Sequence, residues 1–306
     1  MPSPIDTAER RALLDDLLQR TSRTFALAIP LLPEPLHNEV GLGYLLFRIA
    51  DTLEDAERLN RDRRIEQLGR WIELLKAPSV EQAQELAAHW SENPPSDNDD
   101  YNDLMRHTRD VVAALLEREP ASQAILAKHV IRSAEGMAAT LKRADEQGGF
   151  RLGTIDQLRE YCYHVAGIVG EMLTELFRLR LPESEAAAAL DNDSRAFGEA
   201  LQLVNILKDA PDDAHNGRVY LPSDAPREDI IELARTDLRA SVRYAKNLRA
   251  AGAAPGVVAF AELPRRLAEE TLDTLGSTTD RKVSRETVAR VLADTLASAG
   301  IEEAAP

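Results

Sequence analysis

Apolar positions recur at intervals of three and four along almost the whole chain, which is the period of an amphipathic α-helix. Residues 154–157 have the pattern of a capping box, in which polar side chains satisfy the free N–H groups at a helix start. No stretch shows the convincing alternation of a strand. On this pattern we predict an all-α protein with helices near residues 7–20, 36–60, 62–76, 80–91, 101–117, 120–146, 154–180, 183–190, 194–210, 226–252, 255–276 and 284–298.

The interruptions between these helices are short. Gly148-Gly149 and Pro182 are typical helix stops, and SENPPSDNDD (residues 91–100) is a polar loop too short to link two domains. Neither a low-complexity tract nor an internal repeat is present. A chain of 306 residues can bury a large core. We therefore interpret residues 1–306 as a single domain.

One stretch, FRIADTLEDAE (residues 47–57), joins the end of a strongly apolar helix to three carboxylates. Asp51 and Asp55 are four residues apart, so their side chains project from one helical face. Arg48 lies one turn ahead of them. Either these acids mark the point where the helix emerges into water, or they hold a positive group over an apolar pocket.

A second stretch, LQLVNILKDAPDDAHNGRVYLP (residues 201–222), repeats this arrangement. Asp209 and Asp213 are four residues apart, and Asn205 lies on the same face as Asp209. Pro211 falls between the two aspartates and predicts an irregular final turn. Carboxylate and amide oxygens are hard ligands that suit Mg²⁺, which typically bridges carboxylates to substrate phosphates.

Composition limits the classes of partner. The net charge of −15 argues against nucleic acid, which requires a basic surface. The single cysteine, Cys162, excludes an intrachain disulfide and a cysteine-rich zinc site and favours a reducing compartment. We expect Cys162 itself to be a small core residue. The N-terminus has no apolar signal segment, and no apolar run reaches the roughly 18 residues that span a bilayer. We expect a cytoplasmic protein without a transmembrane segment.

The acidic pairs also have an ordinary interpretation. Because 52 of the 306 residues are acidic, pairs four residues apart also arise on solvated helix faces. A literal DDxxD occurs at DDYND (residues 99–103), where it closes the polar loop, and we interpret it as chance. The residues alone leave two alternatives: a divalent-metal diphosphate site, or a non-catalytic helical protein whose acidic faces bind a basic partner.

Four segments in order resemble the squalene/phytoene synthase family of head-to-head prenyl transferases. They are TSRTF (21–25), YLLFRIADTLED (44–55), YCYHVAGIVGEMLTELF (161–177), and LQLVNILKDAPDD (201–213) followed by GRVYLP (217–222). The resemblance implies an isoprenoid-synthase fold, a helical bundle around a central cavity, with the two aspartate motifs facing each other across it.

The resemblance also implies roles for individual residues. Mg²⁺ ions that clamp two prenyl diphosphates would be held by Asp51, Asp55, Asn205, Asp209 and Asp213. The catalytic set it implies consists of Asp51, Asp55, Asp209, Asp213, Tyr163 and His164. Contacts with the prenyl diphosphate substrates are expected from Ser22, Arg23, Thr24, Tyr44, Arg48, Gln202, Asn205, Lys208, Arg218 and Tyr220. A basic cluster near the C-terminus is either solvated surface or a contact for a phosphate of substrate or NADPH, and consists of Arg281, Lys282 and Arg285.

Two glycines in the third segment have two compatible interpretations. Gly167 and Gly170 lie inside a predicted helix, where glycine is unfavourable by about 1 kcal/mol against alanine. Their lack of side chains can serve close helix packing, or it can make room for a prenyl tail.

The region FAELPRRLAEETLDTL (260–275) followed by KVSRE (282–286) resembles squalene synthases more than phytoene synthases. We therefore expect Mg²⁺-dependent condensation of two farnesyl diphosphates to presqualene diphosphate and, with NADPH, to squalene. The alternatives are a phytoene synthase acting on geranylgeranyl diphosphate and an enzyme that stops at presqualene diphosphate. A head-to-tail transferase or terpene cyclase is a further alternative, although no NSE-type motif occurs. NADPH stays open because the chain has no glycine-rich nucleotide motif, and a peripheral membrane contact stays open as well.

Overall fold

The computed structural model describes residues 7–22, 24–277 and 283–301. Three of the residues predicted to contact substrate or NADPH lie outside these ranges: Arg23, Arg281 and Lys282. The packing divides the chain into two compact units. The N-terminal unit is formed by residues up to 27 and residues 37–148, and the C-terminal unit by residues 28–36 and those from 149 onward. The assignment of the chain to a single domain stays a prediction.

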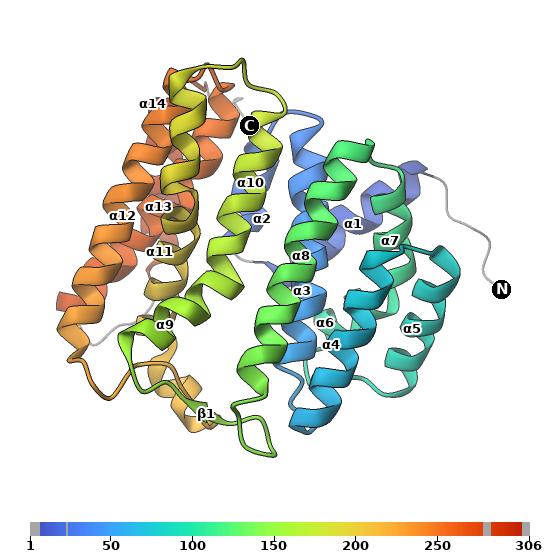
Figure 1. The fold of residues 1–306 in the computed structure, drawn as a ribbon. Helices are drawn as coiled ribbons and strands as arrows, with labels where there is room; N and C mark the ends of the chain where they lie inside the picture. Colours follow the sequence, from blue (N-terminus) through green and yellow to red (C-terminus); the bar gives the residue numbers. More distant parts are fainter. Residues whose placement is uncertain (1–6, 23, 278–282, 302–306) are drawn as a thin grey trace. The chain divides into compact units, whose positions relative to one another are not determined.

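Both units are built from helices (Figure 1), which confirms the all-α prediction. The helices of the N-terminal unit are α1 (Thr7–Thr21), α3 (Leu36–Glu54), α4 (Arg61–Lys76), α5 (Val80–Glu92), α6 (Asp99–Arg106), α7 (Thr108–Leu116) and α8 (Pro120–Leu141). Between α1 and α3 in sequence are the short helix α2 (Phe25–Ala28) and the 3₁₀ turn η1 (Ile29–Leu31). The elements of the C-terminal unit after η1 are β1 (Phe150–Arg151), α9 (Ile155–Cys162), the π-helical segment η2 (Tyr163–Gly167), α10 (Ile168–Arg178), α11 (Glu185–His215), β2 (Arg218–Val219), α12 (Arg227–Ala250), α13 (Pro255–Ser277) and α14 (Arg285–Ala299).

Helix α3 supplies much of the core of the N-terminal unit. Its apolar residues Leu45, Leu46 and Ile49 are at most 1% exposed, as the apolar run ahead of Asp51 predicts. The helix ends at Glu54, earlier than the predicted end at residue 60. The apolar spacing therefore gives the buried face correctly and overestimates the helix length.

The structure contains two very short strands, so the prediction of no strand is wrong. Phe150 pairs with Arg218 and Arg151 pairs with Val219 in a parallel arrangement. The N–H of Phe150 donates to the carbonyl of Gly217 (3.1 Å), and Gly217 has a φ of +77°, which favours glycine. Strands of two residues are too short to show an alternating pattern.

Helix α11 joins two predicted helices, 183–190 and 194–210, and continues to His215. We predict a break at the polar residues between them, but two of these residues make ion pairs with neighbouring helices. Asp191 lies 2.6 Å from Arg178 of α10, and Asp193 lies 2.6 Å from Arg243 of α12. These partners explain why polar side chains continue the helix here.

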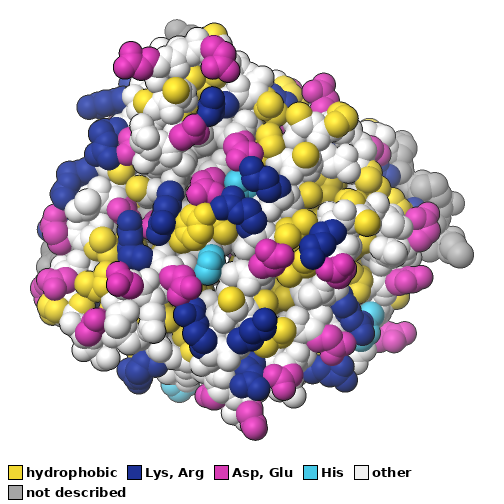
Figure 2. All heavy atoms as spheres, viewed as in Figure 1, with side chains coloured by type: hydrophobic (Ala, Val, Ile, Leu, Met, Phe, Trp, Pro, Cys, Tyr) yellow, Lys and Arg dark blue, Asp and Glu magenta, His cyan; other side chains and the backbone are white. Residues whose placement is uncertain are grey.

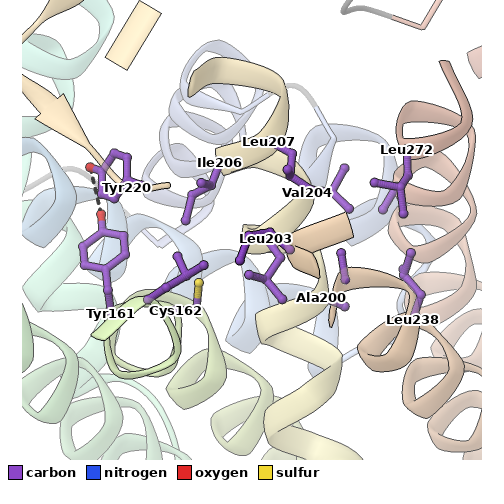
Figure 3. Packing of buried hydrophobic residues seen from close by; sticks show 14 of the residues in the cluster. Tyr161, Cys162, Ala200, Leu203, Val204, Ile206, Leu207, Tyr220, Leu238 and Leu272 are labelled. Atoms are coloured by element: carbon purple, nitrogen blue, oxygen red, sulfur yellow. Dashed lines mark hydrogen bonds between the residues drawn. The ribbon is translucent and has the colours of Figure 1, made fainter. Parts of the chain in front are cut away.

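The apolar face of α11 forms the centre of the C-terminal unit (Figure 3). Leu203 and Leu207 of α11 are buried in one cluster with Tyr161 of α9, Leu238 of α12 and Leu272 of α13. Cys162 is fully buried in the same cluster, which confirms the prediction of a small core residue. This packing fixes the helix whose last turns carry the second aspartate motif.

The glycines of the third motif serve close helix packing. A Cβ atom at Gly170 would lie 2.0 Å from the carbonyl oxygen of Ser194, and one at Gly198 would lie 2.0 Å from that of Ala166. A Cβ at Gly167 would lie 2.9 Å from the ring of Tyr163. Because the backbone of α11 occupies the space beside Gly170, this position does not offer room for a substrate tail.

The capping box predicted at residues 154–157 is confirmed in part: Thr154 caps the helix, whereas the Gln157 side chain bonds one residue before this N-cap. The hydroxyl of Thr154 accepts from the N–H of Gln157 at 3.2 Å, and the side chain of Gln157 accepts from the N–H of Gly153 at 2.7 Å. These contacts start α9, which leads directly into η2.

Candidate active site

The first aspartate motif begins with a chain of polar contacts along α3. The Tyr44 hydroxyl donates to the carbonyl of Thr21 (2.5 Å) and accepts from Arg48 Nε (3.2 Å) and Nη2 (3.1 Å). Arg48 Nη1 in turn lies 3.4 Å from Asp51 Oδ2. The predicted residues Tyr44, Arg48 and Asp51 are therefore brought together by the one-turn spacing of the helix, and Asp55 follows on the exposed side of its end.

Arg48 also lies over two aromatic rings. Its guanidinium lies 5.4 Å from the ring centroid of Tyr44 and 5.3 Å from that of Tyr101, within the range of a cation–π interaction. Tyr101 comes from α6 and is a residue that sequence reasoning misses. The rings restrict the guanidinium, which fixes its direction next to Asp51.

Tyr101 belongs to the DDYND stretch, whose first two residues we assign to the end of the polar loop, and this assignment is wrong. Asp99–Arg106 is helix α6, and the Asn98 side chain caps it by accepting from two backbone N–H groups. Asp100 and Asp103 lie 2.8 Å and 2.5 Å from the guanidinium of Arg20. Two of the three carboxylates of this stretch are thus paired with an arginine of α1.

Burial changes the ionisation of the first motif. Desolvation raises the pKa of Asp51 to about 6, Arg48 counteracts this rise, and the charge of Asp55 adds to it. Burial lowers the pKa of Arg48, but Asp51 and the two tyrosine hydroxyls raise it by more than burial lowers it. The guanidinium therefore stays charged. A cation beside Asp51 and Asp55 would relieve the repulsion between them.

The second aspartate motif lies on the last turns of α11. Lys208 Nζ donates to the side-chain oxygen of Asn205 at 3.2 Å and lies 3.3 Å from Asp209 Oδ2. Asn205 is exposed, whereas Asp209 and Asp213 are half-buried. One ammonium group thus contacts two of the predicted Mg²⁺ ligands. The helix continues through Pro211 to His215, so the proline at which we predict an irregular turn does not end the helix.

The residues after α11 serve mainly to hold its end in place. Tyr220 is only 8% exposed, and its hydroxyl accepts from the hydroxyl of Tyr161 at 3.1 Å (Figure 3). The Phe150 ring packs edge-on against Tyr220 with centroids 5.1 Å apart. Arg218 is half-buried in β2. The structure therefore gives Tyr220 a packing contact, and its predicted contact with substrate stays a prediction.

Tyr163 and His164 lie on η2, a π-helical segment between two α-helices. Such segments are frequent at functional sites because they displace side chains from the regular helical positions. The Arg195 guanidinium lies 4.5 Å from the ring centroid of Tyr163, and the rings of Tyr163 and His164 are 5.8 Å apart. Both candidates for proton handling are half-buried.

A buried ionic cluster lies next to η2. Arg159 contacts Glu199 (2.9 Å) and Asp237, and Arg195 also contacts Glu199. The Glu199 side chain is fully buried. Burial raises the pKa of Glu199 although both arginines counteract the rise. The cluster links α9, α11 and α12, and its Arg195 contacts the ring of Tyr163.

The remaining predicted contacts have local roles or lie at the surface. The Ser22 hydroxyl accepts from the N–H groups of Phe25 (3.1 Å) and Ala26 (3.2 Å), so it caps α2. Thr24 and Gln202 are half-buried, and Arg285 is exposed at the start of α14. Basic and acidic side chains are intermixed on the face seen in Figure 2.

Within the described ranges, no group of three or more His, Cys, Asp or Glu side chains is arranged to hold a metal ion. The predicted Mg²⁺ ligands come from both units: Asp51 and Asp55 from the N-terminal unit, and Asn205, Asp209 and Asp213 from the C-terminal unit. Their approach to one another stays a prediction. No helix in the described part of the chain has the length and apolar character needed to cross a bilayer.

Comparison with known proteins identifies the family. The model of the family named squalene/phytoene synthase matches residues 18–228, a range that contains both aspartate motifs and η2. The chain belongs to the squalene/phytoene synthase family.

Several relatives are named squalene synthase. The chain is 28% identical over 206 residues to the squalene synthase of Schizosaccharomyces pombe, a match that covers 67% of this chain and 43% of that protein. It is 30% identical over 210 residues to that of Eremothecium gossypii, with 68% and 45% covered. The match thus spans less than half the length of these two relatives.

Solved structures share the fold. A structure of TcSQS with the ligand BPH1237 superimposes with a TM-score of 0.75 at 23% identity, covering 94% of this chain and 86% of that one. A dehydrosqualene synthase in complex with a ligand has a TM-score of 0.58 at 21% identity, covering 95% and 96%. These likenesses confirm a fold of the squalene synthase type.

Proposed function

We propose that this protein condenses two farnesyl diphosphates head-to-head to presqualene diphosphate and, with NADPH, converts this product to squalene. The observation that carries the proposal is a pair of matching side-chain groups in a member of this family. One group contains Arg48, Asp51 and Asp55, and the other contains Asn205, Lys208, Asp209 and Asp213. Each combines hard oxygen ligands with a cation, which is what a metal-bound diphosphate requires.

The ligand set fits Mg²⁺. Asp51, Asp55, Asn205, Asp209 and Asp213 would hold the ions through oxygen atoms only. The raised pKa of Asp51 indicates a carboxylate that a neighbouring cation would stabilise. When bound, Mg²⁺ neutralises the diphosphate leaving group and so promotes ionisation of the first donor to an allylic cation.

Two basic side chains would bind phosphate oxygens directly. Arg48 would donate charge-assisted hydrogen bonds to one diphosphate, and Tyr44 and Tyr101 hold its guanidinium in place for this contact. Lys208, which lies beside Asn205 and Asp209, would bind phosphate oxygens through its ammonium group.

The following steps require a dry pocket and a proton acceptor. The double bond of the second donor attacks the cation, and loss of a proton then closes the cyclopropane ring. Tyr163 and His164 are the candidates for accepting this proton, because η2 displaces them from regular helical positions. Water must be excluded, since it would quench the cation. For squalene, hydride from NADPH would follow, with Arg285 and the neighbouring Arg281 and Lys282 as candidate phosphate contacts.

Product analysis tests this proposal. The protein is incubated with Mg²⁺ and farnesyl or geranylgeranyl diphosphate, with and without NADPH. We expect presqualene diphosphate from the farnesyl donor alone and squalene when NADPH is added. Presqualene diphosphate as the product both with and without NADPH would mean that the protein does not carry out the reductive step. Phytoene from the geranylgeranyl donor, regardless of NADPH, would favour the phytoene-type alternative. No product from either donor would favour a binding protein.

The location of the protein also stays a prediction. We propose a cytoplasmic protein that takes prenyl diphosphates from solution. Because the product is apolar, release at a membrane surface is consistent with a peripheral contact. Sedimentation with vesicles, in the presence and absence of product, tests this contact. A protein that makes the contact sediments with the vesicles, and one that does not stays in the supernatant.

A further inference from the structure

Helix α11 continues past a proline that should interrupt its hydrogen bonds. Pro211 lies inside the helix, one turn before its end at His215. Proline has no backbone N–H, so it leaves the carbonyl of the residue four positions earlier without its usual helical donor. That residue is Leu207. The turn affected carries Asp209 and leads to Asp213.

A side chain from the next helix supplies a donor to this carbonyl. Arg227 Nη2 donates to the carbonyl oxygen of Leu207 at 3.1 Å. Arg227 is the first residue of α12, and it follows Pro226, whose extended backbone (φ −66°, ψ 154°) sets where the helix starts. Leu207, backbone included, is 1% exposed, and Arg227 is half-buried. A buried carbonyl needs a partner, and this guanidinium provides one.

We propose that Arg227 is a positioning residue for the second aspartate motif. Its guanidinium replaces the N–H that Pro211 lacks, and it thereby fixes the turn that presents Asp209 and Asp213 to Mg²⁺ and diphosphate. The positive charge near the C-terminal end of α11 also favours the helix dipole. The effect on ligand binding rests on the proposed function, whereas the replacement of the backbone donor does not.

The relation between the two positions gives a specific test. In Pro211→Ala, residue 211 regains an N–H that can donate to Leu207, so Arg227 should become dispensable. Four proteins are compared: the native chain, Arg227→Ala, Pro211→Ala, and the double variant. Binding of Mg²⁺ with inorganic diphosphate is measured by thermal-shift titration, because a ligand bound only to the folded state raises the melting temperature.

We expect Arg227→Ala to weaken binding of Mg²⁺ with inorganic diphosphate about tenfold in the native background, and less than twofold in the Pro211→Ala background. Arg227→Lys, which retains a donor, should recover part of the affinity. Arg239→Ala is the matched control on α12, because Arg239 is exposed and pairs with Glu232 of its own helix at 2.9 Å. The control should bind like the native chain.

Two results would overturn the proposal. Equal weakening in both backgrounds would mean that Arg227 does not act through the Leu207 carbonyl. A lower melting temperature with unchanged affinity would mean that Arg227 only stabilises the fold. If the native chain itself fails to bind Mg²⁺ with diphosphate, the proposed function and the positioning role both fail. Melting of the four ligand-free proteins then still shows whether residues 211 and 227 are coupled.

Discussion

The two aspartate motifs share one sequence pattern but differ in how their side chains are supported. In the first, Arg48 lies between the rings of Tyr44 and Tyr101 and beside Asp51, whose pKa burial raises to about 6. In the second, the flexible Lys208 contacts the exposed Asn205 and the half-buried Asp209.

This difference indicates that the two motifs have different sensitivities. A guanidinium that lies over two rings offers a fixed set of donors, whereas an ammonium on a flexible stem acts as an adaptable point charge. The first motif should therefore depend on the shape of its basic residue, and the second mainly on its charge. The half-buried Asp51 carboxylate of the first motif should also affect the stability of the metal-free protein.

The largest expected effect is common to both motifs. Asp51→Asn and Asp209→Asn keep the size of the side chain and remove the charge that a hard cation needs. We expect kcat/KM with farnesyl diphosphate to fall by a factor of about 10² to 10⁴ in each variant, with an unchanged circular dichroism spectrum. Asp62→Asn, at an exposed aspartate of α4, is the control. Near-normal turnover in either variant would show that its carboxylate is not an essential metal ligand.

Exchanging arginine and lysine at the basic position of each motif should affect the two motifs differently. Arg48→Lys loses the planar group that lies against two rings, and we expect a loss of about thirtyfold in kcat/KM, whereas Lys208→Arg keeps the charge and should lose less than about threefold. Steady-state kinetics at saturating Mg²⁺ measures both. Equal losses would mean that the rings around Arg48 do not distinguish the two motifs.

The sequence predicts the supports of these motifs only in part. The spacing of three and four residues places Tyr44, Arg48 and Asp51 on one side of α3, since neighbours along a helix follow from sequence alone. Contacts with side chains from other helices do not follow from the local sequence. Nothing in the local pattern indicates that Tyr101 of α6 lies over Arg48, or that Arg227 donates to Leu207.

The same limit explains the errors in the fold. The polar residues near Asp191 and Asp193 predict a helix break, but ion pairs with α10 and α12 support them. Strands β1 and β2 form because their backbones pair with each other across the chain. A local pattern of two residues cannot indicate such a pairing. The helical period and the buried faces are predictable because they depend only on near neighbours, and whether the two motifs face each other stays a prediction.

A smaller effect is expected at Tyr101. Tyr101→Ala removes one of the two rings around Arg48, and the loss of a cation–π contact of about 1 kcal/mol corresponds to roughly a fivefold rise in KM for the diphosphate. Tyr101→Phe keeps the ring and should stay within about twofold of the native KM. An equal effect of both substitutions would assign the role to the hydroxyl group instead of the ring.

The smallest effect concerns the metal-free protein and depends on the raised pKa of Asp51 in the first motif. Because the pKa of Asp51 is raised to about 6 in the folded state, against about 3.9 for a free aspartate, the folded protein holds this proton more tightly than the unfolded chain. The ionised side chain therefore destabilises the fold above pH 6, and this penalty disappears as the pH falls from 6 towards 4.

Asp51→Asn removes that penalty. Since the Asp51 side chain is 31% exposed, water recovers part of the full difference, and we expect a gain in the free energy of unfolding of about 1 kcal/mol at pH 8, or roughly 2 °C in melting temperature. The gain should shrink at pH 5, because the native side chain then carries its proton in a larger fraction of the folded molecules. Melting curves at both pH values, recorded with a chelator present, test this. A pH-independent shift in Asp51→Asn would mean that desolvation of the Asp51 charge does not affect the stability of the metal-free protein.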